Sequence, residues 1–295
     1  MGKKVIIPCI TPFRDGKIDL EAVESLALYA DIAGFDGLFY GGSTGAFASL
    51  TMEQHKEILK AGIGTGSDLL LFAGVTRSSL PETLEMVRFS EKIGYENIVS
   101  ITPFYHKYSR KSIAAFYEEL LKNTGLNLYL YNNPPLSGNE LAPETAQYLK
   151  DRYPNVAGVK DSGADMAKFK EFLKIHGLEV YQGKDNLLLQ SLKLGAAGGV
   201  CSSANFCSNT ALIKAGGSTA QEISSKTEKV MELIKKHETP SIHNYLFRRF
   251  ILGEKAPANY MNQPFTEIAD EGVAEQFLPY IYIPSNMQSF LDKNR

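Results

Sequence analysis

The 295-residue sequence contains no tryptophan and only three cysteines, and its formal net charge is −2. The cysteines, Cys9, Cys201 and Cys207, show no CxxC spacing, and their odd number argues against a disulfide framework. A near-neutral charge without a long run of one sign provides no general attraction to nucleic acid or to an anionic membrane. We therefore expect a protein of a reducing compartment, the cytoplasm, that binds neither nucleic acid nor membrane.

Metal-binding and membrane-spanning patterns are also missing. The five histidines form no HxH or HExxH pattern, so the sequence does not predict a metal site. No apolar run approaches the roughly 20 residues of a transmembrane helix. Pro8 and Pro12 interrupt the first apolar segment too early for a signal peptide.

What the chain does contain is a series of eight short apolar runs. They do not alternate polar and apolar residues, which is typical of strands buried on both faces, and they recur at about the length of one βα unit. The runs lie at 5–10, 37–42, 69–75, 97–102, 126–132, 156–160, 178–183 and 195–200. Together with the intervening helical patterns they predict an α/β fold, a (β/α)8 TIM barrel. A doubly wound sheet is the alternative, but no GxGxxG follows the first run.

Helix signals fill the intervals between the runs. Thr51 and Gln54, for example, stand at capping-box spacing before an amphipathic segment. Beyond about residue 208 the strand signal stops and helical patterns follow, one of them expected within 272–293. We therefore expect a catalytic barrel at 1–217 and a C-terminal helical extension at 218–295 that packs on it.

Active sites of such barrels lie at the carboxyl ends of the strands, so the polar residues that end each run are the candidates. The sixth run ends at Lys160, within AGVKDSGAD, and the fifth ends near Tyr131. Spacing alone favours a lysine that simply reaches water. A lysine desolvated in a barrel mouth, however, is favoured as the neutral amine, which attacks ketones and forms a Schiff base. Tyr131 can then carry the proton.

Two other strand ends are ambiguous when taken alone. The GGSTG segment at 41–45 is either a tight strand-to-helix turn or a nest of N–H groups that binds a carboxylate. Asp161 follows Lys160 directly, and we expect it to point away from the site into solvent or toward a helix cap.

Five motifs in order resemble the N-acetylneuraminate lyase / dihydrodipicolinate synthase family, over nearly the whole chain. They are PCITPF, GGSTG, TPFY, YNNP…SG and GVKDS. The resemblance implies a class I aldolase without metal or cofactor, in a (β/α)8 barrel that is usually a homotetramer. It implies that Lys160 forms a Schiff base with pyruvate or another 2-keto acid and that Tyr131 is the acid/base.

The resemblance also implies further site residues. Ser43 and Thr44 would hold the carboxylate of the bound keto acid. Tyr105 would reach into a neighbouring subunit's site and support the proton relay. The alternative is that Tyr105 is only an aromatic residue of the rim or of an interface. The other positions implied around the substrate are Pro8, Ser162, Gly183, Asp185 and Val200.

Departures from the family patterns narrow the substrate. Dihydrodipicolinate synthases have an arginine where this chain has Leu136, and a leucine cannot make a charge-assisted contact with a carboxylate. Sialic acid lyases have a glutamate where this chain has Ala46, and an acid pair where it has Asp185 and Asn186.

The resemblance is therefore strongest to 2-keto-3-deoxygluconate aldolases. We expect reversible cleavage of that acid, or a related 2-keto-3-deoxy sugar acid, to pyruvate and glyceraldehyde, with the non-phosphorylated form favoured. The alternatives within the family are N-acetylneuraminate lyase and 4-hydroxy-tetrahydrodipicolinate synthase. An alternative from another class is a catalytically silent barrel that senses 2-keto acids, but such a barrel would lose Lys160 or Tyr131, and both are present.

Overall fold

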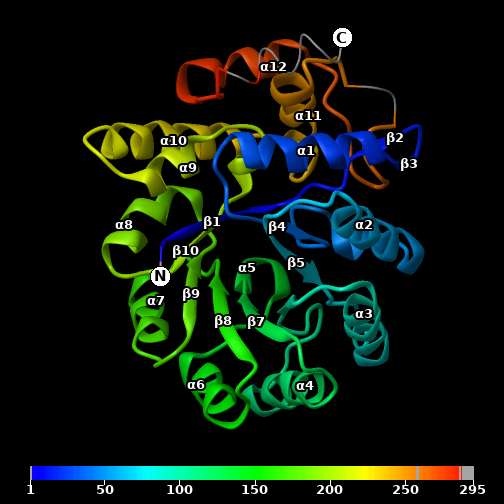
Figure 1. Cartoon of the computed structure of the whole chain (residues 1–295), viewed down its shortest axis with the longest axis vertical. Helices are drawn as coiled ribbons and strands as arrows, with labels where there is room; N and C mark the ends of the chain where they lie inside the picture. Colours follow the sequence, from blue (N-terminus) through cyan, green and yellow to red (C-terminus); the bar gives the residue numbers. More distant parts are fainter. Residues whose placement is uncertain (1, 257–258, 286, 288–295) are drawn as a thin grey trace.

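The computed structural model describes residues 2–256, 259–285 and 287, and its centre is a closed barrel of parallel strands (Figure 1). The barrel strands are β1 (Lys4–Pro8), β4 (Gly37–Tyr40), β5 (Leu70–Gly74), β6 (Asn97–Ile101), β7 (Asn127–Asn132), β8 (Val156–Asp161), β9 (Glu179–Gln182) and β10 (Gly198–Val200). Strands consecutive in this series are neighbours in the barrel, and β10 closes it by pairing with β1. The predicted (β/α)8 fold is confirmed, and each strand overlaps its predicted run.

Helices alternate with the strands and cover the outside of the barrel. They are α1 (Leu20–Ile32), α2 (Met52–Gly64), α3 (Leu80–Ile93), α4 (Arg110–Lys122), α6 (Pro143–Arg152), α7 (Met166–Leu173), α8 (Leu188–Lys193) and α9 (Asn209–Ala215). The predicted capping box forms at α2, where Thr51 Oγ1 accepts from Gln54 N at 3.1 Å and Gln54 Oε1 accepts from Thr51 N at 3.0 Å. No helix in the described part of the chain is long and apolar enough to cross a membrane.

Short elements extend several loops. The hairpin of β2 (Phe13–Arg14) and β3 (Lys17–Ile18) follows β1, and its strands are too short to leave a pattern in the sequence. Four further short helices follow β4, β7, β9 and β10, at the carboxyl ends of those strands. They are η1 (Phe47–Ser49), α5 (Pro134–Ser137), η2 (Asp185–Leu187) and η3 (Ser202–Asn205).

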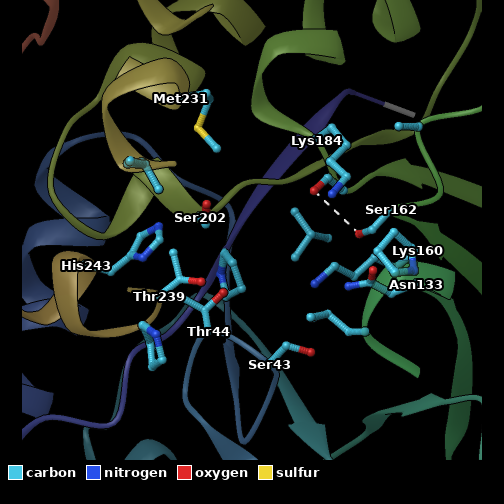
Figure 2. A pocket seen from close by; sticks show the side chains of 18 of the residues that line it. Ser43, Thr44, Asn133, Lys160, Ser162, Lys184, Ser202, Met231, Thr239 and His243 are labelled. Carbon is cyan, nitrogen blue, oxygen red and sulfur yellow. Dashed lines mark hydrogen bonds between the residues drawn. The ribbon is translucent and has the colours of Figure 1, made fainter. Parts of the chain in front are cut away.

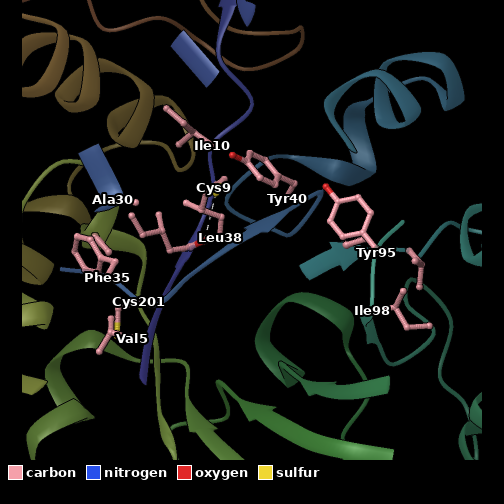
Figure 3. Close-up of a cluster of buried hydrophobic side chains, with 14 of the residues drawn as sticks. Val5, Cys9, Ile10, Ala30, Phe35, Leu38, Tyr40, Tyr95, Ile98 and Cys201 are labelled. Atoms are coloured by element: carbon pink, nitrogen blue, oxygen red, sulfur yellow. Dashed lines mark hydrogen bonds between the residues drawn. The ribbon is translucent and has the colours of Figure 1, made fainter. Parts of the chain in front are cut away.

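An apolar layer outside the strands joins the barrel to its helices (Figure 3). The side chains labelled there are all buried, and each large one contributes about 1.5–3 kcal/mol to folding. They are Val5, Cys9, Ile10, Ala30, Phe35, Leu38, Tyr40, Tyr95, Ile98 and Cys201. Burial raises the pKa of the Cys9 and Cys201 thiols. These cysteines are therefore inert packing residues rather than nucleophiles.

The C-terminal region is helical, as predicted, and Figure 1 shows it gathered along the side of the barrel that carries α1 and α9. It comprises α10 (Ala220–Ile234), α11 (Ser241–Phe247), the π-helix η4 (Arg248–Leu252), α12 (Gly272–Glu275) and η5 (Leu278–Tyr280). Part of the helix expected within 272–293 lies outside the described residues. The predicted boundary after residue 217 falls between α9 and α10 and stays a prediction.

A second apolar core holds this extension to the barrel. Phe206, which follows β10, meets Phe277 edge to face at 6.2 Å between ring centres. The fully buried Arg248 adds a polar tie, because Nη2 donates to Phe13 O at 2.7 Å and to Asp19 Oδ2 at 3.0 Å. The extension is thereby fixed against the end of the barrel where the strands terminate.

Candidate active site

Lys160 and Tyr131 lie side by side at the carboxyl ends of neighbouring strands. The two residues are partners in the register between β7 and β8, so their side chains point to the same face, the barrel interior. Lys160 Nζ is 4.1 Å from the centre of the Tyr131 ring and 5.1 Å from the centre of the Phe39 ring. Lys160 is only 6% exposed, and within the described residues no carboxylate pairs with Nζ. The amine is thus held at the barrel mouth without a bond that would block it.

The Tyr131 phenol is the centre of a polar cluster. Its oxygen accepts from Asn133 Nδ2 at 2.8 Å. Burial alone would raise the pKa of Tyr131, but the charge of Lys160 and hydrogen bonds with Ser43, Asn133 and Ser162 outweigh it and lower the pKa. A phenol that gives up its proton more readily is suited to proton transfer beside the amine. Asn133 was not predicted as a site residue, although it lies within the YNNP motif.

The GGSTG segment forms the turn that follows β4. Gly41 has a φ of +70°, and a Cβ there would come within 2.5 Å of His55 Nε2, so this turn requires glycine. Ser43 and Thr44 both face the cavity (Figure 2). Across the described residues, the backbone N–H groups of Ser43 and Thr44 have no acceptor. Two free N–H donors and two hydroxyls next to Tyr131 are a suitable cradle for a carboxylate.

These groups open into one cavity of about 570 Å³. Eight of the ten predicted site residues line it: Pro8, Ser43, Thr44, Tyr131, Lys160, Ser162, Gly183 and Val200. Ser162 Oγ donates to Gly183 O at 3.5 Å, a contact drawn in Figure 2. A Cβ on Gly183 would lie 1.9 Å from Ser162 Oγ, so the absence of a side chain there leaves room for the serine.

The wall of the cavity opposite Lys160 comes from the C-terminal extension. Figure 2 shows Lys160 and Asn133 on one side and His243 and Thr239 on the other. The lining residues from α10, α11 and the segment between them are Met231, Ile234, Lys235, His237, Thr239, Pro240 and His243. A search of the residues that end the strands could not find them, because only the packing of the extension brings them to the barrel mouth.

Two predicted residues do not line this cavity. Asp185 is buried, and its carboxylate accepts from Ser203 N at 2.8 Å and from Ser202 N at 3.1 Å. It therefore holds the turn η3 in place, and its neighbour Asn186 faces the cavity. Tyr105 is 89% exposed and has a φ of +74°, so it lies on the surface of this chain.

Asp161 points away from the cavity, as expected, but the expectation of a solvated or capping carboxylate is wrong. It is buried, and its Oδ1 accepts from Asn132 Nδ2 at 2.7 Å and from Gly163 N at 3.0 Å. Burial raises the pKa of Asp161 despite these bonds. The residue that caps α7 is instead Asp165, which accepts from two N–H groups of its first turn.

Comparison with known proteins identifies this arrangement. The model of the dihydrodipicolinate synthetase family matches residues 1–276. A 2-dehydro-3-deoxy-D-gluconate/2-dehydro-3-deoxy-phosphogluconate aldolase of Picrophilus torridus is 35% identical over 249 residues, 81% of this chain and 93% of that protein. A 4-hydroxy-tetrahydrodipicolinate synthase of Persephonella marina is 31% identical over 201 residues, 67% of this chain and 69% of that protein.

Solved structures agree with the sequence matches. The 2-keto 3-deoxygluconate aldolase from Picrophilus torridus superposes with a TM-score of 0.84 at 34% identity, covering 92% of this chain and 100% of that chain. A dihydrodipicolinate synthase from Thermotoga maritima, at 21% identity, shares the fold, with a TM-score of 0.85 over 99% of both chains. The chain belongs to the dihydrodipicolinate synthetase family, as a pyruvate-dependent class I aldolase of the carbon–carbon lyase type.

Proposed function

We propose that this aldolase reversibly cleaves 2-keto-3-deoxygluconate, or a closely related 2-keto-3-deoxy sugar acid, to pyruvate and glyceraldehyde. The observation that carries the proposal is the Lys160–Tyr131 pair at a cavity that Leu136 also lines. Leu136 occupies the position at which dihydrodipicolinate synthases have an arginine. Leu136 is 66% exposed and lines the cavity, so it offers an apolar edge there and no partner for a second carboxylate. The name of the Picrophilus torridus relative supports the same substrate class.

The chemistry follows from the positions of the two side chains. The Lys160 amine adds to the C2 ketone and water leaves, which gives an iminium. The Tyr131 phenolate accepts the proton of the C4 hydroxyl, the C3–C4 bond breaks, and the electron pair passes to the iminium, giving an enamine and glyceraldehyde. C3 then takes the proton back from Tyr131, and hydrolysis of the imine releases pyruvate. Ser43 and Thr44 hold the carboxylate through these steps.

The side chains at the mouth support a short sugar acid. Asn186 offers the cavity an amide where sialic acid lyases have an acid, and Ala46 lines a smaller adjoining cavity of about 300 Å³. Neither side chain provides the paired carboxylates that would hold a long glycerol tail. Lyase activity on N-acetylneuraminate is therefore the second candidate, and the synthase reaction the third.

The test is a substrate panel read as pyruvate formation. It compares 2-keto-3-deoxygluconate, its 6-phosphate and N-acetylneuraminate, and it assays condensation of pyruvate with aspartate semialdehyde separately. The proposal expects the highest kcat/KM on 2-keto-3-deoxygluconate. Equal or higher kcat/KM on N-acetylneuraminate, or efficient condensation with aspartate semialdehyde, would reassign the substrate within the family.

We also propose a homotetramer in which Tyr105 enters a neighbouring subunit's site. A positive φ on an exposed tyrosine is unfavourable in an isolated chain, which supports a role for this residue in an assembly. Sedimentation velocity checks the assembly, and mixing Tyr105→Phe with Lys160→Ala subunits checks the shared site. Mixed tetramers that regain no activity beyond the two variants alone would count against it.

A further inference from the structure

His243 is a buried histidine that has no part in the chemistry described above. It lies on α11, lines the cavity, and is only 3% exposed. Among the described residues, neither of its ring nitrogens has a hydrogen-bond partner. In the described part of the chain its one ring contact is with Phe206, at 6.0 Å between ring centres, and this contact leaves the polar atoms unsatisfied. A buried polar group without a partner is unfavourable, so a ligand hydroxyl that reached either nitrogen would satisfy it.

The protonation state of His243 limits what that ligand can be. Burial lowers the pKa of His243 to about 4, so the ring is neutral at neutral pH. A neutral imidazole presents one N–H donor and one acceptor nitrogen. A hydroxyl group, which both donates and accepts, matches this pair, whereas a carboxylate or phosphate finds no positive charge on the ring.

The position of His243 on the cavity wall limits which part of a bound substrate it can reach. Lys160 binds C2, and Ser43 and Thr44 hold the carboxylate, so the carbons beyond the broken bond extend toward the remaining wall. Figure 2 shows His243 on that wall, across the cavity from Lys160 and near Thr239.

We propose that His243 hydrogen-bonds a hydroxyl of the glyceraldehyde half of the substrate and thereby selects hydroxylated aldehydes over plain aliphatic ones. The inference rests on the proposed function. It assigns to α11 a specificity-determining residue that acts on the half of the substrate that Lys160 does not touch.

The experiment uses the condensation direction with saturating pyruvate. The kcat/KM for glyceraldehyde is divided by that for propionaldehyde, which has the same number of carbons and no hydroxyl groups. His243→Phe keeps a flat ring but cannot form the hydrogen bond, so this ratio should fall roughly tenfold or more. His243→Gln, which retains a donor and an acceptor, should keep most of the ratio. An unchanged ratio in folded His243→Phe would overturn the inference.

A matched control comes from the same helix. Tyr245 donates to the carbonyls of Asp270 and Glu271, both at 3.1 Å, and does not line the cavity. Tyr245→Phe should therefore leave the aldehyde ratio unchanged. A fall in this variant equal to that of His243→Phe would indicate a general disturbance of α11 and would overturn the specific role of His243.

Two further measurements separate the outcomes. Borohydride trapping with pyruvate should give the same adduct in His243→Phe as in the wild-type enzyme. If the wild-type enzyme itself forms no pyruvate adduct, the proposed function fails rather than this inference. If His243→Phe does not fold, the wild-type enzyme labelled with ¹⁵N-histidine provides the test. Glyceraldehyde added to the pyruvate complex should shift the ring-nitrogen signals of His243, and an equal shift with propionaldehyde would refute the hydroxyl contact.

Discussion

Replacing Tyr131 with phenylalanine removes one oxygen from the centre of the site. The ring stays beside Lys160, whose Nζ is 4.1 Å from its centre, so packing around the amine is preserved. What is lost is the acceptor for Asn133 Nδ2 and the polar contacts with Ser43 and Ser162. The variant therefore separates proton transfer from the shape of the cavity.

The expected loss of rate follows from the role of the phenol. A positioned acid/base contributes about 10²–10⁴-fold to the rate. At 1.36 kcal/mol for each tenfold change, the activation free energy rises by about 2.7–5.4 kcal/mol. The Asn133 amide, which already lacks a partner for Oδ1 among the described residues, also loses its Nδ2 acceptor. An unpaired buried donor lowers the free energy of unfolding by about 1–3 kcal/mol.

The assay is pyruvate release from the cleaved sugar acid as a function of pH. Because the pKa of Tyr131 in the free enzyme lies below the ordinary 10.0 of tyrosine, the wild-type kcat/KM should rise with pH through a group in that lowered range. Tyr131→Phe should lose both the rate and this rising limb. Tyr117→Phe is the control, since it removes a buried phenol that donates to Ser100 O at 3.1 Å, outside the cavity. A kcat for Tyr131→Phe within about threefold of wild type would refute the reasoning, because acid/base groups contribute far more.

Three further predictions test the supports of the site. Gly183→Ala places a Cβ 1.9 Å from Ser162 Oγ, and the displaced serine should lower kcat/KM roughly 10²-fold without unfolding the chain; near-normal kinetics would contradict it. Asp185→Ala leaves the buried N–H of Ser203 and the partly buried N–H of Ser202 unpaired, and urea unfolding should show a loss of about 2–5 kcal/mol; an unchanged midpoint would refute this. Burial raises the pKa of Asp19, but hydrogen bonds from Arg248 and nearby groups outweigh it and hold the pKa below 3.8. The stabilisation from this carboxylate is therefore present above pH 3.8 and is lost as the pH falls through the lower folded pKa. Asp19→Asn should remove this part of the acid sensitivity of unfolding, and equal pH profiles for the variant and the wild type would contradict the prediction.

The barrel could be predicted from the sequence because its strands are buried on both faces. Runs such as 97–102 and 126–132 stay apolar without alternation, and eight of them between helical segments favour a closed barrel over a doubly wound sheet. The first residue of a helix could also be predicted where a side chain caps the backbone, as at Thr51. The hairpin of β2 and β3 was missed because strands of two residues are too short to show a hydrophobic period.

The candidate site was predictable as far as strand ends define it. Lys160, Tyr131 and the GGSTG turn converge because parallel strands in a closed barrel end at the same rim. Their catalytic roles stay predictions until the reaction is measured. The orientation of Asp161 followed from alternation along β8, but its burial did not, because that depends on Asn132 of the neighbouring strand.

The remaining wall could not be predicted, because it depends on how the extension packs. His243 and Thr239 lie far along the chain from the strands, and no local period shows that α11 meets the barrel mouth. The direction in which the Asp185 side chain points could not be predicted for a related reason. A carboxylate after a strand can face the cavity or turn to neighbouring amides, and the turn η3 supplies two such amides.

The central claim is that Lys160 forms the Schiff base, and covalent trapping tests it most directly. The enzyme is incubated with pyruvate, reduced with borohydride and digested, and the peptides are analysed by mass spectrometry. The account predicts one reduced pyruvyl group on the peptide that contains Lys160, and none in Lys160→Ala. An adduct on another lysine, or pyruvate formation by Lys160→Ala at the wild-type rate, would contradict it.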